Sequence, residues 1–274
     1  MRLLLIRHGE SVDNVAGLYA GSRDSSLTNH GILQAQRLGA HISLAVSCCL
    51  IGPVQHIFAS NLQRAYQTAD AVAEACQLKN DVTLGVTRVE ELREKDFGLS
   101  EGKRFSSKDK DDGSESPVSM RIRIDRFLDR YLGPTVEQLV TENATVVIVA
   151  HGIILNVLLK ALLSRYPPQS LASQLIAERP GSEYLAPWSN TGVLEARLQL
   201  SESNTSFQIP DAEKVRMTIV TTNNVDHLQG LKKTRGGIGS AKFDSRQRTM
   251  DSFFTSSSKK RKFDDDEAQD RRNT

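Results

Sequence analysis

Residues Thr145–Ala150 read Thr-Val-Val-Ile-Val-Ala, and His151 and Gly152 follow directly. Most residues of this run are β-branched, a composition that favours an extended strand. The run is too apolar for a strand with one face in water, so it indicates a strand that is covered on both faces. Two further apolar runs, Leu3–Ile6 and Val54–Ala59, are predicted as strands for the same reason.

Apolar residues recur at helical spacing in the segments between and after these runs. Strands that alternate with amphipathic helices predict an α/β fold: a doubly wound, mostly parallel sheet with helices on both faces. Thr191–Leu198 and Met217–Thr221 are predicted as further strands, and Ser116-Pro117 as a helix start. The helical stripes comprise Ile32, Ala35, Leu38 and Ile42; Ala65, Thr68, Ala69 and Val72; Ile124, Phe127, Leu128 and Tyr131; and Ile154, Val157, Leu158 and Ala161.

Charge is divided unevenly along the chain. The 274 residues carry a formal net charge of +2, but residues 226–274 contain 12 Lys/Arg and 8 Asp/Glu, which leaves −2 on residues 1–225. This basic, Ser-rich, aromatic-poor C-terminal part cannot bury enough apolar surface to offset the conformational entropy lost on ordering. We therefore expect a folded domain over residues 1–228 and a disordered tail over residues 229–274.

The cysteines and the N-terminus bear on the compartment. Cys48, Cys49 and Cys76 show no metal-binding spacing, which favours a reducing compartment without structural disulfides. The apolar run Leu3–Ile6 is too short for a signal-peptide core or a membrane span. The sequence therefore predicts a soluble intracellular protein with no membrane partner.

Polar residues follow three of the predicted strands at the point where each strand ends. Arg7-His8-Gly9 follows the first strand, Ser60–Arg64 the second, and His151-Gly152 the third. The carboxyl ends of parallel strands meet at one edge of a sheet, where ligands bind in folds of this class. We therefore expect the three groups to converge on one site.

His8 has the chemistry of a nucleophile toward phosphorus. An imidazole with its ordinary pKa of about 6.5 keeps a neutral fraction at pH 7, and its ring nitrogen can form a covalent intermediate. Arg7 can hold a phosphate with its planar fork, and Arg64 and His151 can add positive charge around the phosphate oxygens. The combination is suited to phosphoryl transfer.

A departing alcohol needs a proton, and carboxyl groups are available to supply it. Glu94 lies in the turn-prone stretch 90–102, where a carboxyl near a phosphate pocket can act as the acid. Glu91, three residues earlier, is a competing candidate. No metal or other cofactor is expected, because arginines and histidines supply the charge that a metal would otherwise provide.

Four short blocks follow one another along the chain: Arg7-His8-Gly9-Glu10; Ser60-Asn61-Leu62-Gln63-Arg64-Ala65; Leu92-Arg93-Glu94 with Phe97-Gly98 and Glu101-Gly102; and Ala150-His151-Gly152. In this order they resemble the blocks of histidine phosphatases, the phosphoglycerate-mutase-like superfamily. The resemblance covers roughly residues 1–228 and implies that family's α/β fold. It further implies that His8 is phosphorylated and that Glu94 is the proton donor. Phosphate contacts are implied for Arg7, Asn14, Arg64 and His151.

The resemblance also bears on the type of reaction. Mutases of the family carry a longer insertion between the acid block and the second histidine, whereas the segment between Glu94 and His151 is short here. Hydrolysis of the phosphohistidine is therefore favoured, which implies a phosphomonoesterase acting on a phosphorylated substrate that the sequence does not identify. A phosphomutase is an alternative. Ser26 replaces a usual proline of the family, and this departure and the charged loop 103–116 bear on substrate preference.

A second motif lies in the predicted tail. Residues 247–254 read Gln-Arg-Thr-Met-Asp-Ser-Phe-Phe and match the pattern Gln-x-x-(Ile/Leu/Met)-x-x-aromatic-aromatic. They resemble the PIP box, the segment recognised by the sliding clamp PCNA, proliferating-cell nuclear antigen. One helical turn would present Met250, Phe253 and Phe254 together to a hydrophobic pocket. Clamp binding is therefore expected through Gln247, Met250, Phe253 and Phe254.

The basic cluster 259–262, Lys-Lys-Arg-Lys, indicates a nuclear localisation signal and a nuclear import receptor as partner. We expect the protein in the nucleus, with the cytoplasm as a second compartment and no specific nucleic-acid binding. The alternative function is a clamp-binding adapter whose phosphatase fold is vestigial. The intact set of catalytic residues argues against it. Arg37 and Arg123, outside these motifs, are interpreted as solvated helix residues.

Overall fold

The computed structural model describes residues 1–78, 83–105, 113–168, 186–201, 215–232 and 238–244. The chain divides into two units, Met1–Phe243 and Asp244–Thr274. The first unit therefore continues past residue 228, where the composition placed the end of the folded domain. Backbone hydrogen bonds join the end of this unit to its first part: the Phe243 N–H donates to the Leu27 carbonyl and the Asn29 N–H to the Ala241 carbonyl, both at 3.1 Å. The clamp-binding box 247–254 and the basic cluster 259–262 lie outside the described residues.

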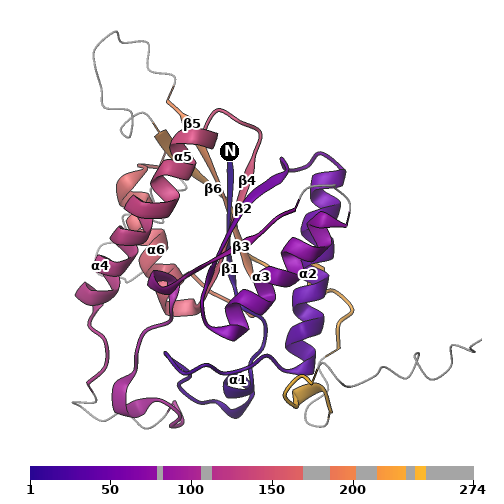
Figure 1. The fold of residues 1–274 in the computed structure, drawn as a ribbon, viewed down its shortest axis with the longest axis vertical. Helices are drawn as coiled ribbons and strands as arrows, with labels where there is room; N and C mark the ends of the chain where they lie inside the picture. The colour runs from indigo at the N-terminus through magenta and orange to yellow at the C-terminus, as the bar shows by residue number, and fades with distance from the viewer. Residues whose placement is uncertain (79–82, 106–112, 169–185, 202–214, 233–237, 245–274) are drawn as a thin grey trace, which may run out of the picture. The chain divides into compact units, whose positions relative to one another are not determined.

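The described part of the first unit contains a six-stranded sheet with the order β3-β2-β4-β1-β5-β6 (Figure 1). Strands β3, β2, β4 and β1 pair in parallel, whereas β5 pairs antiparallel with β1 and with β6. The predicted parallel sheet is thus present, with an antiparallel edge added to it. The strands are β1 (Arg2–Arg7), β2 (Val54–Ser60), β3 (Val86–Val89), β4 (Thr145–Ala150), β5 (Val193–Leu200) and β6 (Val215–Asn224).

Helices cover both faces of the sheet, as predicted (Figure 1). Helices α2 (Asn29–Ser47) and α3 (Gln63–Gln77) cover one face. The other face carries α4 (Pro117–Phe127), α5 (Gly133–Leu139) and α6 (Gly152–Arg165). The short helix α1 (Val12–Ala16) lies beyond the carboxyl ends of the parallel strands (Figure 1).

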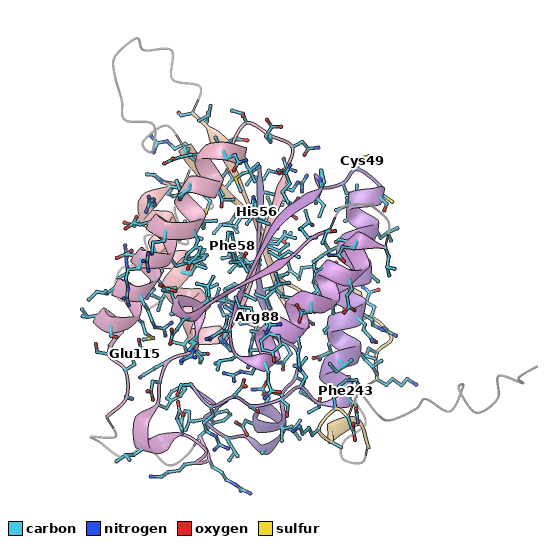
Figure 2. All side chains as sticks on the ribbon, viewed as in Figure 1. Cys49, His56, Phe58, Arg88, Glu115 and Phe243 are labelled. Atoms are coloured by element: carbon cyan, nitrogen blue, oxygen red, sulfur yellow. The ribbon has the colours of Figure 1, made fainter. Side chains whose placement is uncertain are left out.

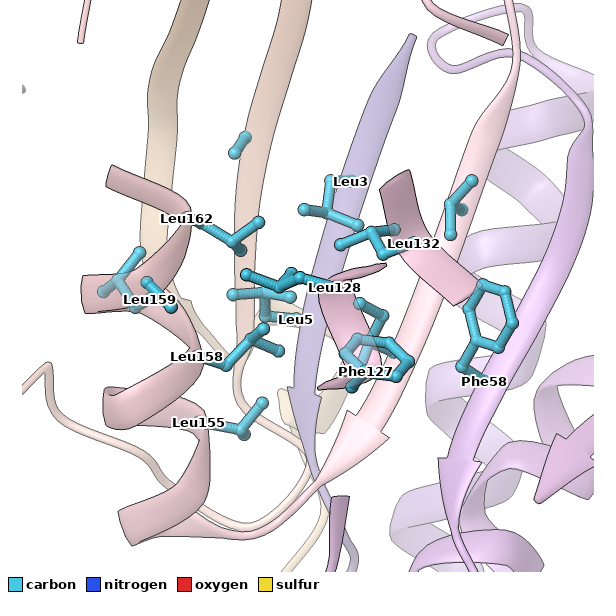
Figure 3. Packing of buried hydrophobic residues seen from close by; sticks show 14 of the residues in the cluster. Leu3, Leu5, Phe58, Phe127, Leu128, Leu132, Leu155, Leu158, Leu159 and Leu162 are labelled. Carbon is cyan, nitrogen blue, oxygen red and sulfur yellow. The ribbon is translucent and has the colours of Figure 1, made fainter. Parts of the chain in front are cut away.

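The alternation of side chains along the buried strands explains the two helical layers. Leu3 and Leu5 of β1 pack with α4 and α6, whereas Leu4 and Ile6 pack with α2 and α3. Figure 3 shows Leu3 and Leu5 between β1 and the leucines of α6. Each large apolar side chain that is fully buried contributes about 1.5–3 kcal/mol relative to an exposed one. A strand with apolar residues at every position therefore needs a helical layer on each side.

Two elements differ from expectation. The stripe that ends at Tyr131 does not finish one helix: α4 passes into a π-helical turn, Leu128–Leu132, and then into α5. Gly133 closes this turn by donating its N–H to the Leu128 carbonyl. Strand β3 was not predicted, because its four residues include Thr87 and Arg88 and give no apolar run. The predicted start of α4 is confirmed, since the Ser116 side chain accepts from the Ser119 N–H at 3.1 Å.

None of the helices in the described ranges combines the length and the apolar character that crossing a bilayer requires.

Candidate active site

The carboxyl ends of the three central parallel strands bring the predicted site residues together. Strand β4 lies between β1 and β2, and Arg7 of β1 is level with Ala150 of β4. The next residues, His8 and His151, therefore emerge side by side, with ring centroids 5.0 Å apart. Arg64, in the first turn of α3, donates from Nε to Nδ1 of His151 at 3.2 Å. Three residues from three different strand ends thus form one cluster.

His8 is held in one orientation and one tautomer. Its side chain is 3% exposed, and its Nδ1 lies 2.6 Å from the Gly9 carbonyl oxygen. Because a carbonyl oxygen only accepts, Nδ1 carries the hydrogen and the lone pair is on Nε2. The turn requires glycine next to the histidine, since a Cβ at Gly9 would lie 2.7 Å from the Gly31 carbonyl oxygen.

The surroundings of His8 keep it neutral. Burial lowers its pKa well below the ordinary value of 6.5, and the positive charges of Arg64 and Arg7 lower it further. A neutral imidazole retains the lone pair that a nucleophile needs. The cluster thus holds His8 in the form that can attack.

His151 and Arg64 act as a fixed pair of donors. Arg64 is 1% exposed, and its other two nitrogens donate to the carbonyl oxygens of Arg23 and Gly21, both at 2.7 Å. Burial is the main reason that the pKa of Arg64 falls to about 10, so this guanidinium stays charged at neutral pH. Since Nδ1 of His151 accepts from Arg64, the hydrogen of the neutral ring is on Nε2.

Two buried N–H groups of the cluster have no hydrogen-bond partner within the described residues. One is Nε2 of His151 and the other is Nε of Arg7. The Nη1 of Arg7 donates to the Trp188 carbonyl at 2.6 Å, which fixes the direction of the guanidinium. Buried donors are nearly always paired in proteins, so unpaired donors at a cluster of positive charge are typical of an anion site.

The Glu94 carboxylate contacts the first turn of α6, the helix that begins directly after His151. This carboxylate accepts from the backbone N–H groups of Lys95 at 2.9 Å, Ile154 at 3.1 Å and Ile153 at 3.2 Å. Its negative charge also acts on the buried guanidiniums of Arg7 and Arg64. The competing acid Glu91 instead lies 3.8 Å from Arg130. Of the two candidate acids, Glu94 is the one whose carboxylate lies at the histidine cluster.

Asn14 is joined to the main chain of His8 through one other residue. Its Oδ1 accepts from Nδ2 of Asn190 at 3.1 Å, and the same Nδ2 donates to the His8 carbonyl at 3.2 Å. Asn190 was not among the predicted residues. It is contributed by the segment before β5, which carries no motif that sequence reasoning could have used.

Arg123 was interpreted as a solvated helix residue, and this interpretation is wrong. Its side chain is 11% exposed and donates to the carbonyl oxygens of Glu91, Arg93 and Glu94. Carbonyl oxygens occur at every residue, so the sequence held no signal for these contacts.

A cleft of about 520 Å³ opens beside the acid. Every lining residue except Gly113 has a polar or charged side chain, and the set includes Glu94 and residues of both signs of charge. The lining residues are Ser22, Glu90, Glu91, Arg93, Glu94, Asp96, Gly113, Glu115, Ser119, Arg123 and Arg126. His8, Arg64 and His151 are not among the lining residues, and the volume is in the range of sites that bind small organic ligands.

Known proteins with related sequences and folds match most of this unit. A probable phosphatase of Schizosaccharomyces pombe is 29% identical over 261 residues, covering 91% of this chain and 78% of the relative. The probable phosphoglycerate mutase GpmB of Proteus mirabilis is 30% identical over 180 residues, 60% of this chain and 75% of the relative. The structure of a mycobacterial glucosyl-3-phosphoglycerate phosphatase with VO3 superposes with a TM-score of 0.60 at 23% identity, covering 81% of this chain and 98% of that one.

Residues 3–178 match the family model of the histidine phosphatase superfamily, branch 1. The match spans β1 to β4 and α6, and so includes His8, Arg64, Glu94 and His151. This chain is therefore a member of the histidine phosphatase superfamily.

Proposed function

We propose that this protein hydrolyses phosphomonoesters through a phosphohistidine formed on Nε2 of His8. The observation that carries the proposal is the neutral His8 beside two unpaired buried donors, Nε of Arg7 and Nε2 of His151. Such donors can bind the oxygens of a phosphoryl group while the lone pair of His8 faces phosphorus. Members of the superfamily that resemble this chain are named as phosphatases or phosphoglycerate mutases, which supports the same chemistry.

In the first step, Nε2 of His8 forms a bond to phosphorus while the bond from phosphorus to the leaving oxygen breaks. Glu94 gives that oxygen a proton, so that it departs as a neutral alcohol. The guanidiniums of Arg7 and Arg64 and the Nε2–H of His151 hold the charge on the phosphoryl oxygens, and Asn14 adds an amide contact. Water then forms a bond to phosphorus while the P–N bond breaks and the Glu94 carboxylate takes a proton from the water, which releases phosphate and restores both His8 and the acid.

The same phosphoenzyme could return its phosphoryl group to a product, which would make the protein a phosphomutase. The short segment between Glu94 and His151 favours water as the acceptor, and the S. pombe relative that spans most of this chain is named a phosphatase. The reaction as proposed uses no metal, because two guanidiniums supply the positive charge. A mutase would require a bisphosphate primer and release little inorganic phosphate.

The pH dependence of kcat/KM should reflect the neutral state of His8. Because burial, Arg64 and Arg7 lower the pKa of His8 below 6.5, the attacking form persists below that pH and is lost only in more acidic solution. We expect kcat/KM, corrected for the ionisation of the substrate phosphate, to show no decrease around pH 6.5. It should decrease only at pH values well below 6. A corrected rate that keeps rising into strong acid would contradict the assignment.

We further propose that residues 247–254 dock on the sliding clamp and that the cluster 259–262 directs nuclear import. The support is the sequence: every defined position of the clamp motif is filled, and the basic cluster follows closely. Only residues 244–246 separate the motif from Phe243, which pairs with Leu27 of the folded unit. The motif therefore begins four residues after Phe243 in the sequence.

Replacing both Phe253 and Phe254 by alanine should weaken binding to the purified clamp by about 100-fold or more, because paired aromatic anchors dominate such interfaces. Turnover should not change, since neither residue belongs to the phosphatase unit. Titration calorimetry against the clamp measures the first effect and phosphate release the second. Phe263→Ala is the matched control, an aromatic of the same tail outside the motif. Equal affinity in the double variant would remove the docking proposal.

A further inference from the structure

Arg123 of α4 gathers three backbone carbonyls of the segment that carries the acid. Its Nη1 donates to the carbonyl oxygens of Glu91 and Arg93, both at 2.6 Å. Its Nη2 donates to the carbonyl oxygen of Glu94 itself at 3.2 Å. A guanidinium has five N–H donors in a rigid plane, so it can fix several acceptors relative to one another.

Glu115 sets the orientation of Arg123 from the other side. Its two carboxylate oxygens accept from Nε at 2.8 Å and from Nη2 at 2.9 Å, a two-bond pairing in which both side chains are nearly buried. Burial raises the pKa of Glu115, but the hydrogen bond and charge of Arg123 outweigh it and the net shift is downward. Figure 2 shows Glu115 on the segment that leads into α4.

The backbone around Glu94 has little regular structure of its own. It follows a single 3-10 turn, Glu90–Leu92, and the next such turn begins at Gly98. Glu115 reaches this stretch too, through the bond from its own N–H to the Asp96 carbonyl at 2.8 Å. The side chain of Glu94 rests on α6, whereas its main chain is held by Arg123 of α4. Two helices thus fix Glu94, one through its carboxylate and the other through its main-chain carbonyl.

We propose that Arg123, oriented by Glu115, is the positioning residue that sets Glu94 for proton transfer to the leaving oxygen. Because it concerns the acid of the phosphatase reaction, the proposal rests on the proposed function. Arg123 also lines the cleft, but in this role it acts through the main chain of Glu94 and not by direct contact with the nucleophile. A displacement of about 1 Å in a catalytic group can cost on the order of 100-fold in rate. A substitution of Arg123 that lets Glu94 move should therefore lower the rate, although Arg123 itself transfers no proton.

The test uses two substrates that differ in their need for an acid. An alkyl phosphate releases a strongly basic alkoxide and depends on proton donation, whereas para-nitrophenyl phosphate releases a stable phenolate without it. Arg123→Lys keeps the charge but loses the planar fork that holds three carbonyls. We expect it to lower kcat/KM for the alkyl phosphate by about 100-fold and to change kcat/KM for para-nitrophenyl phosphate by less than about threefold.

The matched control is Arg121→Lys on the same helix. Arg121 also pairs with a carboxylate, Asp125, at 2.8 Å, but its side chain is 43% exposed, and within the described residues no hydrogen bond or ion pair joins it to residues 90–96. The Arg121→Lys substitution should leave kcat/KM unchanged for both substrates. Glu115→Gln, which weakens the hold on Arg123 without removing it, should reproduce the alkyl-specific loss to a smaller degree. This second variant keeps the proposal testable if Arg123→Lys folds poorly.

A double-mutant cycle separates positioning from general destabilisation. In a Glu94→Gln background, Arg123→Lys should cause no further alkyl-specific loss, because residues that act through one group are not additive. Equal losses for both substrates, or a full additional loss in that background, would overturn the role of Arg123. Turnover that does not depend on His8 would instead overturn the proposed function, so the two failures are distinguishable.

Discussion

Replacing His8 by alanine is expected to lower the rate of phosphate release from phosphomonoesters by about three orders of magnitude or more. The lone pair on Nε2 is the group that forms the P–N bond, and no other side chain of the cluster can replace it, because Nδ1 of His151 accepts from Arg64. Phosphate release from a panel of phosphomonoesters, measured with a chelator and no added metal, tests the loss directly.

A covalent readout accompanies this prediction. Rapid acid-free quenching of the wild type with labelled substrate should trap label on the protein through an acid-labile, alkali-stable P–N bond, and His8→Ala should carry none. His56→Ala is the control, a histidine in the amino-terminal half of β2 (Figure 2). If the wild type released no more phosphate than His8→Ala from a broad panel of phosphomonoesters, the hypothesis of a clamp-binding adapter would replace that of a phosphatase. Dependence on a bisphosphate primer would indicate the mutase.

Arg64→Lys should have the next largest effect, a loss of about 100- to 1,000-fold in kcat/KM. Lysine keeps the positive charge but cannot bond at once to His151, Gly21 and Arg23, which the guanidinium does through three different nitrogens. His151 then loses the donor that fixes its tautomer, so Nε2 no longer presents its hydrogen to the phosphoryl group. One substitution thereby weakens two of the proposed phosphate contacts.

Three measurements separate this effect from unfolding. Thermal denaturation should show that Arg64→Lys remains folded, kcat/KM should fall, and inhibition by inorganic phosphate should weaken. Arg88→Lys is the matched control, because Arg88 stacks on Tyr66 and pairs with Asp70 at the half-exposed edge strand β3 (Figure 2). Unchanged kcat/KM together with unchanged phosphate inhibition in Arg64→Lys would remove Arg64 from the phosphate site.

The buried centre of the fold could be predicted because its residues have only one structural use. Thr145–Ala150 form a strand with the predicted bounds, and all six residues are buried. The edge strand β3 could not, since it includes polar residues that are held by pairing with β2. Helix α5 was missed because Gly133 and Pro134, with which it begins, are ordinary signals of a helix end. Here Gly133 instead closes a π-helical turn.

The site was predictable to a similar extent. The residues proposed to touch phosphate follow strand ends within recognisable blocks, and the structure gathers His8, Arg64 and His151 into one cluster. The residues that orient them carry no comparable signal. Arg123 and Asn190 act on backbone carbonyls, which depend on how distant segments pack and not on residue type.

The bond from Arg64 to His151 makes the site's positive charge insensitive to ordinary changes in acidity. Both nitrogens of His151 are committed, one as acceptor from Arg64 and the other as the carrier of the ring hydrogen, so the ring cannot take up a proton without breaking that bond. The positive charge around the phosphoryl oxygens would therefore come from the guanidiniums of Arg7 and Arg64, and burial lowers the pKa of Arg64 only to about 10. Over the neutral pH range, the ionisation of the substrate phosphate would therefore decide how tightly these guanidiniums bind it. The positive charge of such a site would stay constant over this pH range, so that the nucleophile His8 and the acid Glu94 are the groups whose protonation changes during turnover.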